Sequence, residues 1–209
     1  MSHALPRLFL VSPLMDETGA RDAVSAALEA LAQVEIAALL LRGGALPGGD
    51  PPSLLGPVIT AAQGRDIAVL LEDRPDLVAA TGADGVHLTL TEKGRSPIRD
   101  LGRRFGDNVI LGAGCGTSRH LAMTAGEQGA DYVAFGGATA GAPEPDLVAW
   151  WEAVMTPPQV ALGAADVQEA RRLAGAGADF LGLPPGFWLE DRDPAARLLG
   201  LLDGLAQGT

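Results

Sequence analysis

The residues of this chain that could do chemistry stand shortly after apolar runs. Arg42, the pair Glu72 and Asp73, and Glu92 each follow such a run. The later runs are followed by small residues instead: Gly114, Cys115, Gly136, Gly137, Gly163, Ala164 and Gly182. Carboxylates can bind a metal ion, a cysteine can act as a nucleophile, and glycines can expose backbone amides to a phosphate. A glycine-rich loop can equally have lost its ligand, so both interpretations stay open.

The apolar runs predict buried parallel strands. The runs 8–11, 37–41, 67–71 and 109–111 show no polar alternation, which is typical of strands covered on both faces. The segments between strands have apolar residues at three- and four-residue spacing, which predicts amphipathic helices. These segments include 21–34, 119–129, 166–177 and 193–206.

A short internal sequence repeat indicates repeated strand–helix units. GADGVHL begins at Gly82, GADYVAF at Gly129 and GADFLGL at Gly177, so their aspartates are 47 and 48 residues apart. We expect these aspartates to stabilise turns, because they lie on the helix-to-strand side of each unit. Strands are expected near residues 8, 37, 67, 85, 109, 131, 159 and 179. Eight units predict a single (β/α)8 TIM barrel over residues 1–209 as one domain, with an open doubly wound sheet as the competitor.

Composition excludes several partners. A formal net charge of −11 argues against nucleic acid and anionic membranes, which need basic partners. The single cysteine cannot form an internal disulfide or a cysteine-rich zinc site. The amino-terminal residues resemble a first strand more than a signal peptide, and no run is long enough for a membrane span. We therefore expect a cytoplasmic protein.

Several motifs are similar to those of the thiamine phosphate synthase and TenI superfamily. The most specific is LLEDRPDLVAATGADGVHLTLTE (70–92), supported by LLLR (39–42), VILGAGCGTSRHL (109–121) and GADYVAFG (129–136). The resemblance covers nearly the whole chain. It implies an enzyme of thiamine biosynthesis that joins hydroxymethylpyrimidine diphosphate to thiazole phosphate, releasing diphosphate with the help of Mg²⁺.

The resemblance also implies roles for residues. Arg42 matches a diphosphate-binding arginine, and Asp73 and Glu92 match the two aspartates that bind Mg²⁺. Glu72 replaces an asparagine, and Gly114 stands where a serine contacts substrate. We accordingly predict Arg42, Glu72 and Cys115 as catalytic, and Asp73 with Glu92 as the metal ligands.

Phosphate binding is expected at the remaining small residues, namely Gly114, Gly136, Gly137, Gly163, Ala164 and Gly182, together with Arg42. Two family lysines are replaced here, by Gly44 and by Glu144. A carboxylate in place of an ammonium repels a diphosphate by an energy on the order of kcal/mol. The expected partners are small phosphorylated substrates, and self-association into a homo-oligomer stays open.

Alternatives accompany these predictions. The protein could be a TenI-like thiazole tautomerase, although Gly116 stands at that activity's histidine, or a silent relative that binds a thiamine-related phosphate. Asp73 could instead cap a helix beginning at Pro75. Cys115 could simply fill space at the barrel rim. His87 could shuttle protons or be an inward histidine held by a hydrogen bond.

Overall fold

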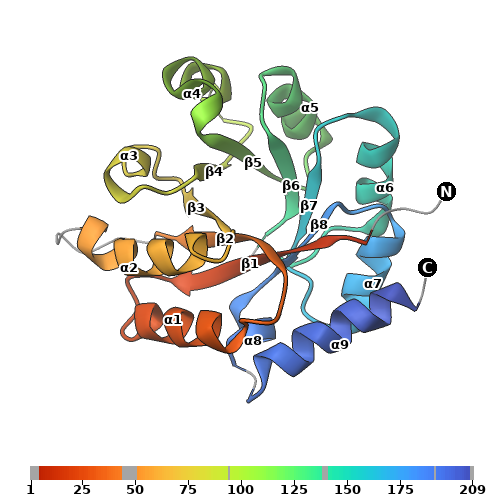
Figure 1. Ribbon diagram of the computed structural model, residues 1–209. Coiled ribbons are helices and arrows are strands. Elements are labelled where there is room, and N and C mark those ends of the chain that lie inside the picture. The colour runs from red at the N-terminus through yellow and green to blue at the C-terminus, as the bar shows by residue number, and fades with distance from the viewer. Residues whose placement is uncertain (1–4, 44–50, 94, 138–140, 191, 208–209) are drawn as a thin grey trace.

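A computed structural model describes residues 5–43, 51–93, 95–137, 141–190 and 192–207, and its strands form a closed parallel barrel. The barrel order is β1 to β8, with β1 pairing β8 to close the ring. The helices surround the strands (Figure 1). The predicted (β/α)8 TIM barrel is confirmed.

Strands and helices alternate along the chain. The strands are β1 (Arg7–Leu14), β2 (Ile36–Arg42), β3 (Ala68–Glu72), β4 (Gly85–Thr89), β5 (Ile110–Gly116), β6 (Tyr132–Gly136), β7 (Gln159–Leu162) and β8 (Phe180–Leu183). The helices are α1 (Ala20–Ala30), α2 (Pro51–Gln63), α3 (Val78–Thr81), α4 (Ile98–Phe105), the 3₁₀ turn η1 (Gly106–Asn108), α5 (Arg119–Glu127), α6 (Pro145–Val154), α7 (Val167–Gly175), α8 (Pro185–Trp188) and α9 (Pro194–Ala206). None of the described helices is long and apolar enough to cross a membrane.

Alternating side chains along each strand build two cores. One set faces inward and fills the barrel: Phe9, Val11, Ala38, Leu40, Leu70, Tyr132, Ala134, Val160 and Leu162. The other set packs against the helices and includes Leu39, Leu41, Val69 and Leu71. Because side chains alternate with a period of two, the parity of a residue decides whether it can reach the barrel interior.

The three aspartates of the sequence repeat stabilise the barrel at the amino-terminal ends of its strands. Each accepts a hydrogen bond from the amide near the start of the preceding strand. The bonds are Val69 N to Asp84 Oδ2 at 2.7 Å, Leu111 N to Asp131 Oδ2 at 2.7 Å, and Gln159 N to Asp179 Oδ2 at 2.8 Å. The aspartates therefore have a structural role, as predicted, at the end of the barrel opposite the one where chemistry occurs, but they join neighbouring strands rather than stabilise the turns.

Inward glycines make room for large neighbours inside the barrel. A β-carbon at Gly112 would overlap the Tyr132 ring, and one at Gly114 would lie 2.7 Å from His87 Nε2. Tyr132 also packs edge-on against Phe9, with ring centroids 5.9 Å apart. Gly112 and Gly114 are therefore required by packing of the interior.

Candidate active site at the carboxyl end of the barrel

Arg42 and Glu72 meet at the carboxyl ends of β2 and β3. Arg42 lies two residues beyond the inward Leu40, and Glu72 two beyond the inward Leu70, so both continue the interior rows. Arg42 Nε lies 3.4 Å from Glu72 Oε2, with side chains 18% and 24% exposed. The structure thus brings together two residues that are 30 positions apart in the sequence.

The backbone of Arg42 is fixed from β1. Its amide donates to Ser12 Oγ at 3.0 Å, and its carbonyl accepts from Met15 N at 2.9 Å. Within the described residues, however, buried Arg42 Nε makes no well-formed hydrogen bond. The guanidinium therefore keeps donor capacity for another acceptor, and an arginine offers five N–H groups for an anionic ligand.

The environment of Glu72 disfavours its charge. Burial raises the pKa of its carboxyl above the ordinary value, and the neighbouring Asp73 raises it further. Arg42 opposes both effects by favouring the carboxylate. The charge state of Glu72 thus depends on whether Arg42 stays beside it.

Asp73 joins β3 to β4 rather than capping a helix. Its amide donates to His87 O at 2.9 Å, and its Oδ1 accepts from Thr89 N at 2.7 Å. Its φ of 53° is a left-handed conformation that aspartate tolerates better than most residues. Helix α3 begins only at Val78, so the alternative in which Asp73 caps a helix at Pro75 is wrong.

Glu92 is anchored to the start of α5. Ser118 Oγ donates to Glu92 Oε1 at 3.1 Å, and the same Ser118 caps α5 by accepting from Leu121 N. Asp73 and Glu92 therefore lie on neighbouring loops, each with one carboxylate oxygen in a hydrogen bond to the protein. No three His, Cys, Asp or Glu side chains in the described residues cluster as a metal site. Two carboxylates nevertheless suit Mg²⁺, which takes few protein ligands and completes its shell with phosphate and water.

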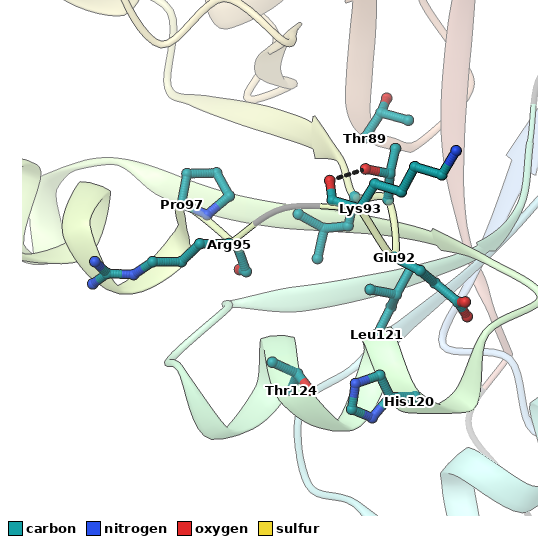
Figure 2. Close-up of a pocket in the computed structure, with 11 residues that line it drawn as sticks. Thr89, Glu92, Lys93, Arg95, Pro97, His120, Leu121 and Thr124 are labelled. Atoms are coloured by element: carbon teal, nitrogen blue, oxygen red, sulfur yellow. Dashed lines mark hydrogen bonds between the residues drawn. The ribbon is translucent and has the colours of Figure 1, made fainter.

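A pocket of about 170 Å³ lies between the β4–α4 loop and α5 (Figure 2). Glu92 and Lys93 line it from the loop, and His120 and Thr124 from the helix. Thr91 Oγ1 donates to Lys93 O at 2.9 Å and so stabilises the loop conformation. Sequence reasoning did not single out Lys93, Thr89 or Ser118. Only the serine left a signal, because it immediately precedes a predicted helix.

Cys115 faces the helices, not the barrel interior. It belongs to the core between strands and helices, and its Sγ–H donates to Ala113 O at 3.3 Å. Burial raises the pKa of its thiol to about 12. Because the thiolate is the nucleophile, this position argues against the predicted catalytic role. It favours the alternative of a small buried residue.

His87 is an inward histidine held by a hydrogen bond. Its Nδ1 lies 2.8 Å from Tyr132 Oη, and the rings stack with centroids 5.8 Å apart. Burial lowers the pKa of His87 to about 4 and raises that of Tyr132 well above its ordinary value. Both side chains are therefore neutral at physiological pH, which favours the second of the two interpretations.

The glycines after β6 and β7 pack backbone against backbone. Gly137 and Gly141 exchange hydrogen bonds of 3.1 Å in both directions. A β-carbon at Gly163 would lie 2.7 Å from the carbonyl carbon of Gly141, and one at Gly136 would lie 2.7 Å from Gly141 O. The amides of Gly137 and Gly163 already have partners, because Gly163 N donates to Gly182 O at 2.8 Å. Tight packing alone accounts for these glycines.

The turn after β7 carries a carboxylate of its own. Ala165 N donates to Glu169 Oε2 at 2.8 Å, and Glu169 N donates to Asp166 Oδ1 at 2.8 Å. Ala164 beside it is buried, and an inward β-carbon at Gly182 would overlap Leu162. Exposed Glu144 precedes α6, while Gly44 lies outside the described residues. Fewer backbone amides are thus free to bind a phosphate here than the number of glycines suggests.

Comparison with known proteins places the chain among similar sequences. The family profile described as thiamine monophosphate synthase matches residues 8–183. The thiamine-phosphate synthase of Rhodospirillum centenum is 39% identical over 201 residues, covering 91% of this chain and 93% of that protein. That of Hyphomonas neptunium is 37% identical over 207 residues, covering 91% and 89%.

Solved structures show the same barrel. Thiamine phosphate pyrophosphorylase from Pyrococcus furiosus superposes with a TM-score of 0.78 at 21% identity, covering 95% of this chain and 96% of that one. (S)-3-O-geranylgeranylglyceryl phosphate synthase from Thermoplasma acidophilum superposes with a TM-score of 0.71 at 13% identity, covering 97% and 94%. At such low identity these superpositions establish the fold alone.

Proposed function

This chain belongs to the thiamine monophosphate synthase family, and from that premise we propose that it is a thiamine phosphate synthase. The reaction joins hydroxymethylpyrimidine diphosphate to thiazole phosphate. The bond between the pyrimidine methylene carbon and the diphosphate oxygen breaks, diphosphate leaves, and the methylene carbon becomes bonded to the thiazole. The observation that carries the proposal is the family match over residues 8–183, within which Arg42, Glu72, Asp73 and Glu92 lie at or just beyond the carboxyl ends of neighbouring strands.

The chemistry requires positive charge at the leaving group. Negative charge accumulates on the diphosphate as the carbon–oxygen bond breaks, so groups that bind it more tightly then accelerate the step. We assign Arg42 to this role, because its guanidinium lies at the barrel mouth and has donors left over. Glu72 positions that guanidinium through their 3.4 Å ion pair. When diphosphate binds, the guanidinium must either leave Glu72 or contact Glu72 and the diphosphate together.

Mg²⁺ is part of the proposal. The carboxylate oxygens of Asp73 and Glu92 that do not accept from Thr89 N and Ser118 Oγ would hold the ion. When bound, it would neutralise charge on the diphosphate. Cys115 has no role here, and the predicted contacts at Gly114, Gly136, Gly137, Gly163, Ala164 and Gly182 remain predictions.

The test is synthesis of thiamine phosphate by the purified protein. We expect product when both phosphorylated precursors and Mg²⁺ are present, and a large loss when EDTA replaces Mg²⁺. Arg42→Ala should lower kcat/KM by about a hundredfold, because an ionic contact that strengthens in the transition state is lost. No product at high enzyme concentration rejects the proposal.

A second assay distinguishes the tautomerase alternative from the synthase activity. Turnover of thiazole phosphate without any diphosphate substrate would support it, whereas the two sequence relatives reported above are both named thiamine-phosphate synthase. If the wild type makes no product but Glu144→Lys with Gly44→Lys restores binding of inorganic diphosphate, the loss of these two charges is the cause, and the protein is a silent relative. Cytoplasmic location and self-association stay predictions, and light scattering after size exclusion tests the latter.

A further inference from the structure

Lys93 is the only lysine in the chain, and it stands on the loop that follows β4. Two arginines near the ends of β2 and β3 already lie beside carboxylates. Arg42 lies beside Glu72, and Arg74 Nη2 lies 2.8 Å from Asp76 Oδ2. Arg95, two residues beyond Lys93, lies 3.2 Å from Asp100. Lys93 makes no ion pair with any carboxylate in the described part of the chain, so its ammonium is available to an anionic ligand.

The loop that carries Lys93 is held over the end of β5. Leu90 N donates to Gly114 O at 2.8 Å, which continues the pairing of β4 and β5 past the last residue of β4. Two residues later Glu92 accepts from Ser118, and Thr91 Oγ1 donates to Lys93 O. Three contacts thus fix the backbone from 90 to 93, so that Lys93 starts from a defined point on the rim between β4 and β5.

The side chain of Lys93 extends away from that of Arg95. Figure 2 shows the two on opposite sides of the loop, with the Lys93 ammonium on the side where the Glu92 carboxylate lies. At the carboxyl end of β5, a β-carbon on Gly116 would meet no atom within 4 Å, whereas Tyr132 and His87 fill the space over Gly112 and Gly114 deeper in the barrel. An ammonium on a flexible four-carbon stem is a compact charge suited to phosphate oxygens.

We propose that Lys93 binds the diphosphate of the substrate from the β4–α4 loop, in addition to the guanidinium of Arg42. The assignment rests on the proposed function for the identity of the substrate. For the residue, it rests on the absence of an ion pair to Lys93 among the described residues, on the fixed loop, and on the open space at Gly116. Lys93 would thereby supply an ammonium to a site where Glu144 and Gly44 cannot.

Kinetics test the role of the charge. Lys93→Gln should raise KM for the pyrimidine diphosphate about tenfold, a change typical of losing one charged contact, and leave KM for thiazole phosphate unchanged. Lys93→Arg should recover most of the loss. Arg95→Gln is the matched control, since it removes the same charge from the same loop and should leave both KM values near those of wild type. An unchanged KM in Lys93→Gln overturns the assignment.

Chemical labelling tests binding without requiring activity. Pyridoxal phosphate forms an imine with an amine, with loss of water, and borohydride reduces it to a stable secondary amine. Besides Lys93, the protein has only its terminal α-amine as a target, so peptide mass spectrometry resolves two sites. Inorganic diphosphate with Mg²⁺ should protect Lys93 at least tenfold and leave the α-amine labelled.

Equal labelling of Lys93 with and without diphosphate overturns the assignment, whatever the kinetics. The two proposals fail separately. If the protein makes no thiamine phosphate yet diphosphate protects Lys93, the synthase activity is wrong and the diphosphate contact stands. If product forms but protection and the KM change are absent, the activity stands and the Lys93 assignment is wrong.

Discussion

Asp73 offers a sharp test, because its structural and metal-binding roles can be separated by two substitutions. Asparagine keeps an Oδ1 that can accept from Thr89 N, tolerates the left-handed φ of 53°, and removes the charge. Alanine removes the charge and the acceptor together. Both variants should lose activity supported by Mg²⁺, but only Asp73→Ala should lose substantial stability.

The expected difference follows from two local contributions. A hydrogen bond to a charged group contributes about 1.5 kcal/mol at the low end of its range, which suits this exposed pair. Placing alanine in a left-handed conformation costs about 1 kcal/mol more. We therefore expect Asp73→Ala to lower the free energy of unfolding by about 2.5 kcal/mol and Asp73→Asn by less than about 1 kcal/mol.

Urea denaturation without Mg²⁺ measures these stability differences, and the dependence of activity on Mg²⁺ concentration measures the metal role. If Asp73→Asn kept the Mg²⁺ dependence of wild type, the metal assignment would be wrong. If Asp73→Ala were as stable as wild type, the bond from Thr89 N would contribute nothing, and the account of how β3 and β4 are joined would fail.

Three further changes test the interior of the barrel. Cys115, whose thiol pKa is about 12, should resist iodoacetamide at pH 8 until the protein is unfolded. The variant Cys115→Ala should stay active. Rapid labelling of the native protein would contradict the burial of this thiol. The folded pKa of His87, about 4, lies below its unfolded value of 6.5. The contribution of neutral His87 to the free energy of unfolding is therefore present above pH 6.5 and is lost as the pH falls toward 4. The loss amounts to about 3 kcal/mol in all. Urea titrations of wild type and His87→Gln should differ in this pH window, and identical pH profiles would refute it. Gly112→Ala should destabilise the fold by about 1–3 kcal/mol through overlap with Tyr132, whereas Gly56→Ala, in open space on α2, should be neutral or stabilising; equal stabilities contradict the packing.

The sequence by itself determined the architecture. Unbroken apolar runs and three copies of the GAD motif predict eight covered strands, because a parallel barrel buries both faces of each strand and needs the same turn at alternate units. It also placed Arg42, Glu72, Asp73 and Glu92 at the ends of strands. Once the parallel strands close into a barrel, residues at their carboxyl ends all lie on the same rim.

Only the tertiary structure decided what each of these positions does. The side-chain parity of β5 turns Cys115 toward the helices, a fact that depends on register and not on residue type. The glycines after β6 and β7 look like a phosphate loop in sequence, yet their amides are used between Gly137, Gly141, Gly163 and Gly182. Whether a cation forms an ion pair likewise depends on distances in the fold, because the sequence shows only that Arg42 and Lys93 are both positively charged. Only the fold shows that Arg42 has a carboxylate 3.4 Å away, and that Lys93 has none among the described residues.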